Sequence, residues 1–171
     1  MKALLTVSVL TAAAVLTIGL NGAWASSHSA KVRSTVSVGS SGLGKILVDG
    51  RGRTLYLFGK DTRGKSMCAG ACATSWPPLI ASGKPRVAGG AKVSLLGTTK
   101  RADGRLQVTY KSHPLYLFVN DTKKGQTTGE GLDAFGAGWY ALSPAGARIA
   151  KAASGAPSPA GGYGGDGGYG Y

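Results

Sequence analysis

The chain is poor in negative charge and in the residues that most often carry catalysis. Seven acidic side chains stand against 20 basic ones in 171 residues, with two histidines and two cysteines. No serine lies in a G-x-S-x-G context, and the C-x-x-x-C spacing of Cys68 and Cys72 differs from the C-x-x-C of thioredoxin-type proteins. These shortages argue against serine hydrolases and thiol oxidoreductases. The sequence therefore predicts a protein that is not an enzyme and has no cofactor.

Cysteine is also missing from the start of the chain. No cysteine precedes Cys68, which excludes a lipid-modified cysteine near the N-terminus. Met1 and Lys2 form a short basic start, and the uncharged run Ala3–Leu20 leads to an A-x-A cleavage site that ends at Ala25. Residues 1–25 are thus predicted to be a signal peptide, and the protein to be secreted or periplasmic. The alternative is a retained membrane anchor, because the apolar run is just long enough to span a bilayer; no transmembrane segment follows it.

Long helical patterns are absent as well, and short apolar runs with glycine-rich turns take their place. The string L-Y-L-F-x-x-D occurs at residues 55–61 and again at residues 115–121. Five identities in seven positions indicate a tandem duplication. The predicted fold is all-β: a small antiparallel β domain made of two tandem pseudo-symmetric repeats.

The two motifs are predicted to be strands that are covered on both sides. Side chains alternate across a strand, so Tyr56 and Phe58 share one face while Leu55 and Leu57 share the other. The same holds in the second motif. Its structural residues are Tyr116, Phe118 and Asp121, which correspond to Tyr56, Phe58 and Asp61.

Each motif ends on an aspartate that precedes a turn. Asp61 and Asp121 are both followed by threonine. We expect each carboxylate to accept local backbone N–H bonds, as in an Asx-turn. The alternative is a carboxylate pair for a cation or for acid–base chemistry.

Composition divides the rest of the chain. Residues 26–42 are rich in Ser, Val and Gly and are predicted to be a linker, with room for a short strand near 36–38. The folded domain is placed at residues 43–150, with a hairpin over 46–58 and strand candidates at 92–96, 105–110 and 139–142. Residues 151–171 are rich in Gly and Tyr, have no large aliphatic side chain, and are predicted to be a disordered tail.

The motifs resemble a known family. Besides L-Y-L-F-x-x-D, the chain carries Asp49-Gly50-Arg51-Gly52 before the first motif, Trp76-Pro77-Pro78-Leu79 after it, and Gly138-Trp139-Tyr140 near the end. Together these are similar to the secreted bacterial repeat proteins, also called predicted lipoproteins, that share a Y-x-(F/W/Y)-x-x-D motif. The resemblance implies secretion and a two-repeat architecture. It implies no activity, and the missing N-terminal cysteine departs from the lipoprotein label.

The cysteines and tryptophans are given structural roles. In an oxidising compartment Cys68 and Cys72 are expected to form a disulfide that fixes the loop before Trp76. The alternative is a redox or metal-binding protein that uses Cys68, Cys72 and His113, since soft ligands of this kind suit copper. Trp76 and Trp139 are interpreted as equivalent core anchors, with exposed sugar-stacking platforms as the alternative.

The excess of positive charge lies in the folded domain, where residues 43–150 hold 16 basic and six acidic side chains. Two basic clusters lie at the two aspartates. They are Lys60, Arg63 and Lys65 on either side of Asp61, and Lys123 and Lys124 after Asp121. Such charge favours anionic partners. Export separates the protein from chromosomal nucleic acid, so we expect no nucleic-acid partner. We expect an anionic envelope polymer or a membrane surface instead; the alternative is charge that serves solubility alone.

Overall fold

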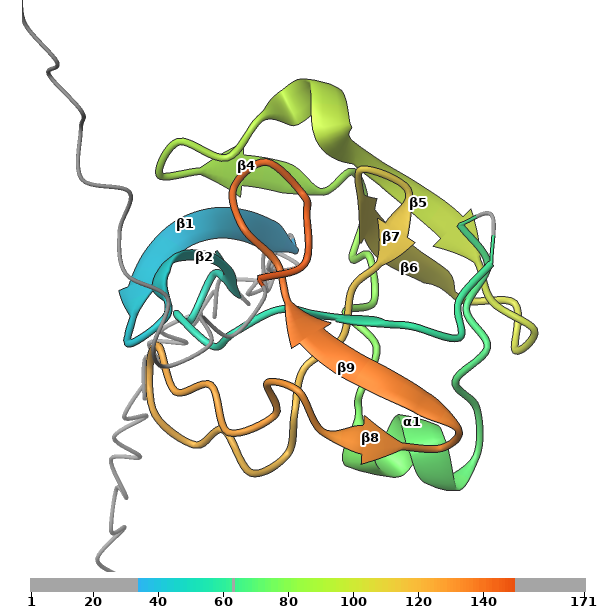
Figure 1. Ribbon diagram of the computed structural model, residues 1–171. Helices are drawn as coiled ribbons and strands as arrows, with labels where there is room; N and C mark the ends of the chain where they lie inside the picture. The colour runs from blue at the N-terminus through green and yellow to red at the C-terminus, as the bar shows by residue number, and fades with distance from the viewer. Residues whose placement is uncertain (1–33, 63, 150–171) are drawn as a thin grey trace, which may run out of the picture. The chain divides into compact units, whose positions relative to one another are not determined.

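The protein is described by a computed structural model that places residues 34–62 and 64–149 (Figure 1). The predicted signal peptide and the predicted C-terminal tail lie outside these residues, as does Arg63. Among the described residues, no helix is long and apolar enough to cross a membrane.

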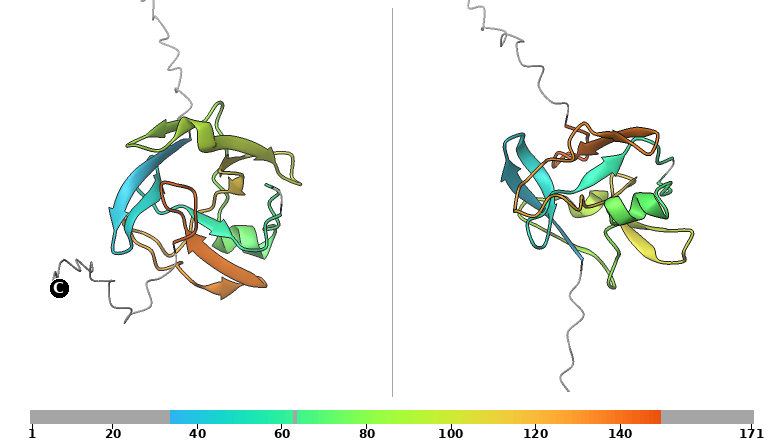
Figure 2. Two further views of the ribbon diagram at one scale, coloured as in Figure 1. Left: turned by 45° about the horizontal axis from the view of Figure 1, so that its top comes forward. Right: turned by 90° about the horizontal axis from the view of Figure 1, so that it is seen from below.

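The described chain is built mainly of short strands (Figure 2). In order they are β1 (Thr35–Ser41), β2 (Gly44–Asp49), β3 (Tyr56–Phe58), β4 (Arg86–Ala88), β5 (Leu96–Lys100), β6 (Leu106–Tyr110), β7 (His113–Pro114), β8 (Asp133–Ala134) and β9 (Ala137–Ala141). One short helix, α1 (Ala71–Ser75), and one 3-10 turn, η1 (Val93–Leu95), interrupt them. The predicted all-β class is confirmed.

The strands form three small sheets, with the orders β2-β1-β4, β3-β9-β8 and β5-β6-β7. All neighbours are antiparallel except β1 and β4, which run parallel. The first motif strand, β3, pairs with β9 near the far end of the chain, so that Phe58 lies opposite Trp139. The two repeats therefore share sheets instead of forming separate units.

Each motif separates two apolar clusters. The tyrosine and phenylalanine side chains of β3 enter one cluster, with Trp76 and Trp139, while its leucines enter the other. The second motif was predicted to be a strand as well, but β7 ends at Pro114 and Tyr116 forms only isolated bridges, to Tyr56 and Pro78. Its side chains are nevertheless divided between the same two clusters. The alternation of side chains along a strand thus explains why every position of L-Y-L-F is apolar.

The two motifs pair with each other through reciprocal backbone hydrogen bonds. The Tyr56 amide donates to the Tyr116 carbonyl at 2.9 Å, and the Tyr116 amide donates to the Tyr56 carbonyl at 3.0 Å. Bonds further out repeat in the same way: Leu142 N–H donates to the Leu55 carbonyl, and Leu79 N–H to the Leu115 carbonyl. The repeats are therefore related by a pseudo-two-fold axis, which confirms the predicted pseudo-symmetry. The first motif lies against the Trp139 segment of the second repeat, and the second motif against the Trp76 segment of the first.

Three predicted boundaries need correction. Residues 35–41, assigned to the linker, form β1, whose Val36 is fully buried, so the folded part begins before Leu43. The run 92–96 is largely a 3-10 turn, and the strand starts only at its last residue, Leu96. The predicted hairpin closes between Val48 and Thr54, but beyond Leu55 the second arm pairs with β9. Packing of apolar side chains from distant parts of the chain overrides these local patterns.

Candidate functional site

The aspartates of the two motifs bind the tyrosines crosswise. The Tyr56 hydroxyl donates to Asp121 of the second motif, and the Tyr116 hydroxyl donates to Asp61 of the first at 2.9 Å. Both tyrosines are fully buried, and Asp121 is nearly so. The Y-x-F-x-x-D pattern is therefore a lock between repeats: each tyrosine finds its acceptor at the end of the other motif.

The local Asx-turns expected at these aspartates are not what the structure shows. Asp61 accepts the backbone N–H of Met67, six residues ahead, and Asp121 accepts both N–H and hydroxyl of Thr128, seven residues ahead. Each carboxylate thus closes a wide loop and binds a tyrosine of the other repeat. The two carboxylates have different tyrosine partners, which supports a structural role and not a shared cation site.

Burial shapes the electrostatics of the lock. Removal from water raises the pKa of both tyrosines well above the ordinary value, and the neighbouring carboxylates add to the rise. Burial also raises the pKa of Asp61 to about 6, against the lowering effect of the Met67 amide, the Tyr116 hydroxyl and Arg101. The tyrosines therefore stay protonated and act as hydrogen-bond donors at any ordinary pH.

The aromatic rings of the motifs form a continuous stack across the axis. Ring centroids are separated by 4.1 Å from Phe58 to Trp139, 3.9 Å from Trp139 to Trp76, and 4.2 Å from Trp76 to Phe118. The two tyrosines pack edge-on against the tryptophans. Because both tryptophans are at most 1% exposed, they are core anchors, and the alternative of exposed sugar-stacking platforms is wrong.

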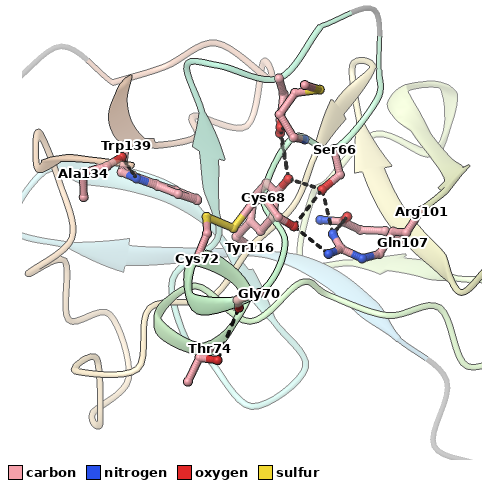
Figure 3. Close-up of a disulfide and its surroundings, with 12 residues drawn as sticks. Ser66, Cys68, Gly70, Cys72, Thr74, Arg101, Gln107, Tyr116, Ala134 and Trp139 are labelled. Carbon is pink, nitrogen blue, oxygen red and sulfur yellow. Dashed lines mark hydrogen bonds between the residues drawn. A yellow bond between two sulfur atoms is a disulfide. The ribbon is translucent and has the colours of Figure 1, made fainter. Parts of the chain in front are cut away.

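Cys68 and Cys72 form the predicted disulfide beside the first aspartate (Figure 3). Both cysteines are buried, and Cys72 lies in α1. The buried Arg101 holds this loop in place, donating to the Cys68 carbonyl, to Ser66 and to Gln107, each at 2.7 Å. Ser66 lies 2.7 Å from the Tyr116 hydroxyl, so the disulfide loop and the Tyr116–Asp61 bond are parts of one network.

A pocket of about 250 Å³ opens next to this network. Its charged lining consists of Arg101, Asp103 and Arg105, and the carboxylate of Asp103 accepts hydrogen bonds from both guanidinium groups. That pairing, together with the remaining bonds of Arg101, leaves these groups occupied within the protein. The pocket is therefore not built around a free charge that would attract a ligand.

His113 does not join the cysteines in a ligand set. It lies on β7, half-buried, where burial and the nearby Lys111 lower its pKa. The two sulfurs are bonded to each other, and within residues 34–62 and 64–149 no three His, Cys, Asp or Glu side chains gather as metal ligands would. The redox or metal-binding alternative thus gains no support from the geometry.

The basic clusters are placed on the surface. Lys60, Lys65, Lys123 and Lys124 are all exposed. The structure adds a neighbour that the sequence did not reveal: the Gly125 amide donates to the Gly52 carbonyl at 3.0 Å, and the Lys124 side chain lies over Gly52. The second cluster therefore sits against the turn that carries Arg51 and Arg53.

Most of the described carboxylates accept hydrogen bonds from the protein itself. Asp49 is bonded to Arg53 and to two backbone amides, and Glu130 accepts the Ala141 amide. Asp61, Asp103 and Asp121 are engaged as described above. The ion pairs of the described residues involve arginines only, and all nine described lysines are exposed. The lysine charges are therefore uncompensated by described carboxylates.

Sequence reasoning missed the residues that support the lock. Arg101, Gln107 and Thr128 lie outside the motifs, and their contacts join positions that no local pattern connects. The one usable signal was polar residues within otherwise apolar strand sequence. Gln107, fully buried on β6, is the clearest case.

A family model described as a secreted repeat of unknown function matches residues 37–80 and 97–143. The first matched segment contains the first motif and Trp76, and the second contains the second motif and Trp139. No curated protein matches the chain, and no solved structure does.

Proposed function

Since the chain belongs to the family of secreted repeats of unknown function, we propose that it is a non-enzymatic protein of the cell envelope that binds anionic polymers or surfaces. In this proposal residues 1–25 are a signal peptide that is removed on export. The mature protein then acts in the periplasm or outside the cell as a binding module.

The observation that carries the proposal is the imbalance of charge on the surface. Five of the six acidic residues in the described chain accept hydrogen bonds from the protein itself, whereas the lysines are exposed and without described ion pairs. An uncompensated positive surface raises the local concentration of polyanions and speeds their association.

The pseudo-symmetry supports two binding surfaces of similar character. The loop after each motif carries one basic cluster and is held by its motif aspartate, through Met67 in the first repeat and Thr128 in the second. In the second repeat Lys123 and Lys124 combine with Arg51 and Arg53 of the first. We call the residues Lys60, Arg63, Lys65, Lys123 and Lys124 the loop cations.

The test is retention of the exported protein on anionic envelope polymer at two salt concentrations. A variant with all five loop cations changed to Gln should bind at least about tenfold more weakly, because each cation near an anionic surface contributes on the order of 1 kcal/mol. Binding by the unchanged protein should fall steeply with salt, since screening shortens to about 8 Å at physiological ionic strength.

A matched control changes five other basic residues to Gln and removes the same charge. They are Lys45, Lys84, Arg86, Lys92 and Lys100, all exposed. Little loss in this control would assign binding to the loop cations. Equal loss in both variants would reduce the effect to net charge, and retention that ignores salt would rule the proposal out.

A further inference from the structure

The β8–β9 hairpin ends in an unusual turn. Asp133 pairs with Gly138 and Ala134 with Ala137, so Phe135 and Gly136 form a two-residue connection. Their φ angles are 61° and 88°, both in the left-handed region, as a type I′ turn requires at its two central positions. Asn-Gly is the favoured pair for such a turn, and a phenylalanine there is a genuine outlier. Since backbone strain of this kind concentrates at functional positions, the choice of Phe135 calls for an explanation.

Packing within the protein does not supply that explanation. The Phe135 side chain is 43% exposed, and Leu132 nearby is 40% exposed. The alanines on either side of the turn, by contrast, pack against the core cluster of Trp76 and Trp139. Two large apolar side chains, Leu132 and Phe135, are therefore exposed at a hairpin whose neighbouring alanines are packed against the core. We define the hairpin tip as Leu132, Phe135 and Gly136.

The base of the tip is rigidly held. The Trp139 indole N–H donates to the Ala134 carbonyl at 3.1 Å, and the Trp139 amide donates to the Leu132 carbonyl at 2.9 Å. The Gly59 amide donates to the Gly138 carbonyl at 2.9 Å, which ties the hairpin to the first motif. An apolar group on such a scaffold meets a partner without first losing much conformational freedom.

The tip is a feature of the second repeat only. In the first repeat the segment before the equivalent Trp76 is the helix α1 with its disulfide. The core aromatic stack is the same on both sides of the axis, so the shared fold does not demand an exposed phenylalanine. The other exposed large apolar side chains of the described residues are far apart in the chain: Met67 and Val119 lie in loops, Val93 in η1 and Leu106 in β6. Single exposed apolar residues of this kind are normal.

The charge around the tip narrows the kind of partner. The ammonium group of Lys60 lies 3.6 Å from the point that a Cβ atom on Gly136 would occupy, so a loop cation lies at the turn that carries Phe135. Asp133, the exposed first residue of β8, carries a negative charge that opposes the positive charge of Lys60. An aromatic ring beside a lysine on a basic domain is complementary to an anionic bilayer, where the ring enters the interfacial region and the cation meets the head groups.

We propose that the hairpin tip inserts into the interface of an anionic lipid bilayer. This inference rests on the proposed function and specifies its partner: the loop cations attract the protein to the surface, and Phe135 anchors it there. One aromatic side chain gives weak and reversible attachment, which salt and the loss of basic residues will both reverse.

The test compares vesicles that contain phosphatidylglycerol with vesicles of phosphatidylcholine alone and with soluble polyphosphate. Phe135→Asn should weaken binding to the anionic vesicles about tenfold, the effect of withdrawing part of a large apolar side chain. It should leave binding to polyphosphate unchanged. It should also raise the melting temperature, because Asn suits the left-handed turn better than Phe. A merely structural role for Phe135 would move stability and binding in the same direction.

Three further variants sharpen the result. Phe135→Trp should retain binding, and its added fluorescence should shift to the blue on anionic vesicles. Asp133→Asn should tighten binding by removing the opposing charge. Val93→Asn is the matched control, because it removes an apolar side chain that is 73% exposed and lies outside the tip, and it should bind as the unchanged protein does.

The outcomes separate this inference from the proposed function. If Phe135→Asn binds anionic vesicles normally while the loop-cation variant does not, the tip is not the anchor, but the proposed function stands. Binding to polyphosphate without binding to vesicles would make the partner a polymer and overturn the inference. Self-association that is lost in Phe135→Asn would identify a second copy of the chain as the occupant and would overturn it too. Binding to neither anion would end both proposals.

Discussion

The crossed Tyr–Asp bonds predict a specific pattern of energetic coupling. Tyr56 and Asp121 come from different repeats, and their bond is buried. Changing Tyr56 to Phe removes the hydroxyl and leaves the ring in place. The coupling energy between Tyr56→Phe and Asp121→Asn, measured in a double-mutant cycle, should be about 1.5–3 kcal/mol, as for hydrogen bonds to charged groups.

The magnitudes should differ between the two halves of the lock. Asp121 is 3% exposed, whereas Asp61 is in a half-buried position where water can replace part of the lost bond. Asp121 keeps the N–H and hydroxyl of Thr128 as donors, so Tyr56→Phe alone does not leave the carboxylate unsatisfied. We expect the single change to lower the free energy of unfolding by about 2 kcal/mol, and Tyr116→Phe by about 1 kcal/mol.

The decisive comparison is between crossed and uncrossed pairs. The crossed pairs Tyr56–Asp121 and Tyr116–Asp61 should be coupled, and the pairs within one motif, Tyr56–Asp61 and Tyr116–Asp121, should show less than about 0.5 kcal/mol. Urea unfolding followed by tryptophan fluorescence measures all four cycles. Tyr140→Phe is the control, because it removes a half-buried tyrosine hydroxyl outside the lock and keeps the ring that Arg148 covers. Coupling within motifs, with none across them, would refute the crossed arrangement.

Two further predictions concern pH and the disulfide. The pKa of Asp61 is raised to about 6 in the folded state from 3.8, so between pH 4 and 6 the folded protein holds a proton that the unfolded chain has released. The free energy of unfolding should therefore fall as pH rises through this window. The melting temperature of Asp61→Asn should fall less over the same window than that of the unchanged protein. A difference of the opposite sign would show that the carboxylate is not destabilised by burial. Reducing Cys68–Cys72 opens a loop of sequence separation four and should lower the free energy of unfolding by about 2 kcal/mol on the loop-entropy model, without abolishing folding. Intact-mass spectrometry of unreduced protein should find it two hydrogens lighter than the reduced form, and free thiols in freshly exported protein would contradict the structural role.

The sequence by itself determined the units of this protein. Repetition of L-Y-L-F-x-x-D established two copies, and alternation of side chains along a strand established that both faces of each motif are buried. The close spacing of Cys68 and Cys72, together with the predicted export to an oxidising compartment, led to the prediction of their disulfide. These features follow from local backbone geometry, which a short stretch of chain specifies without reference to the rest.

The tertiary structure alone decided how the units are joined. An isolated repeat is equally compatible with a tyrosine that binds its own aspartate and with one that binds its neighbour's; only the pseudo-two-fold pairing of Tyr56 with Tyr116 selects the second. The support of the disulfide loop by Arg101 and the exposure of Phe135 on a hairpin are set in the same way. Hydrogen bonds and packing between distant residues depend on where the whole chain places them, and a sequence pattern with a short period carries no record of that placement.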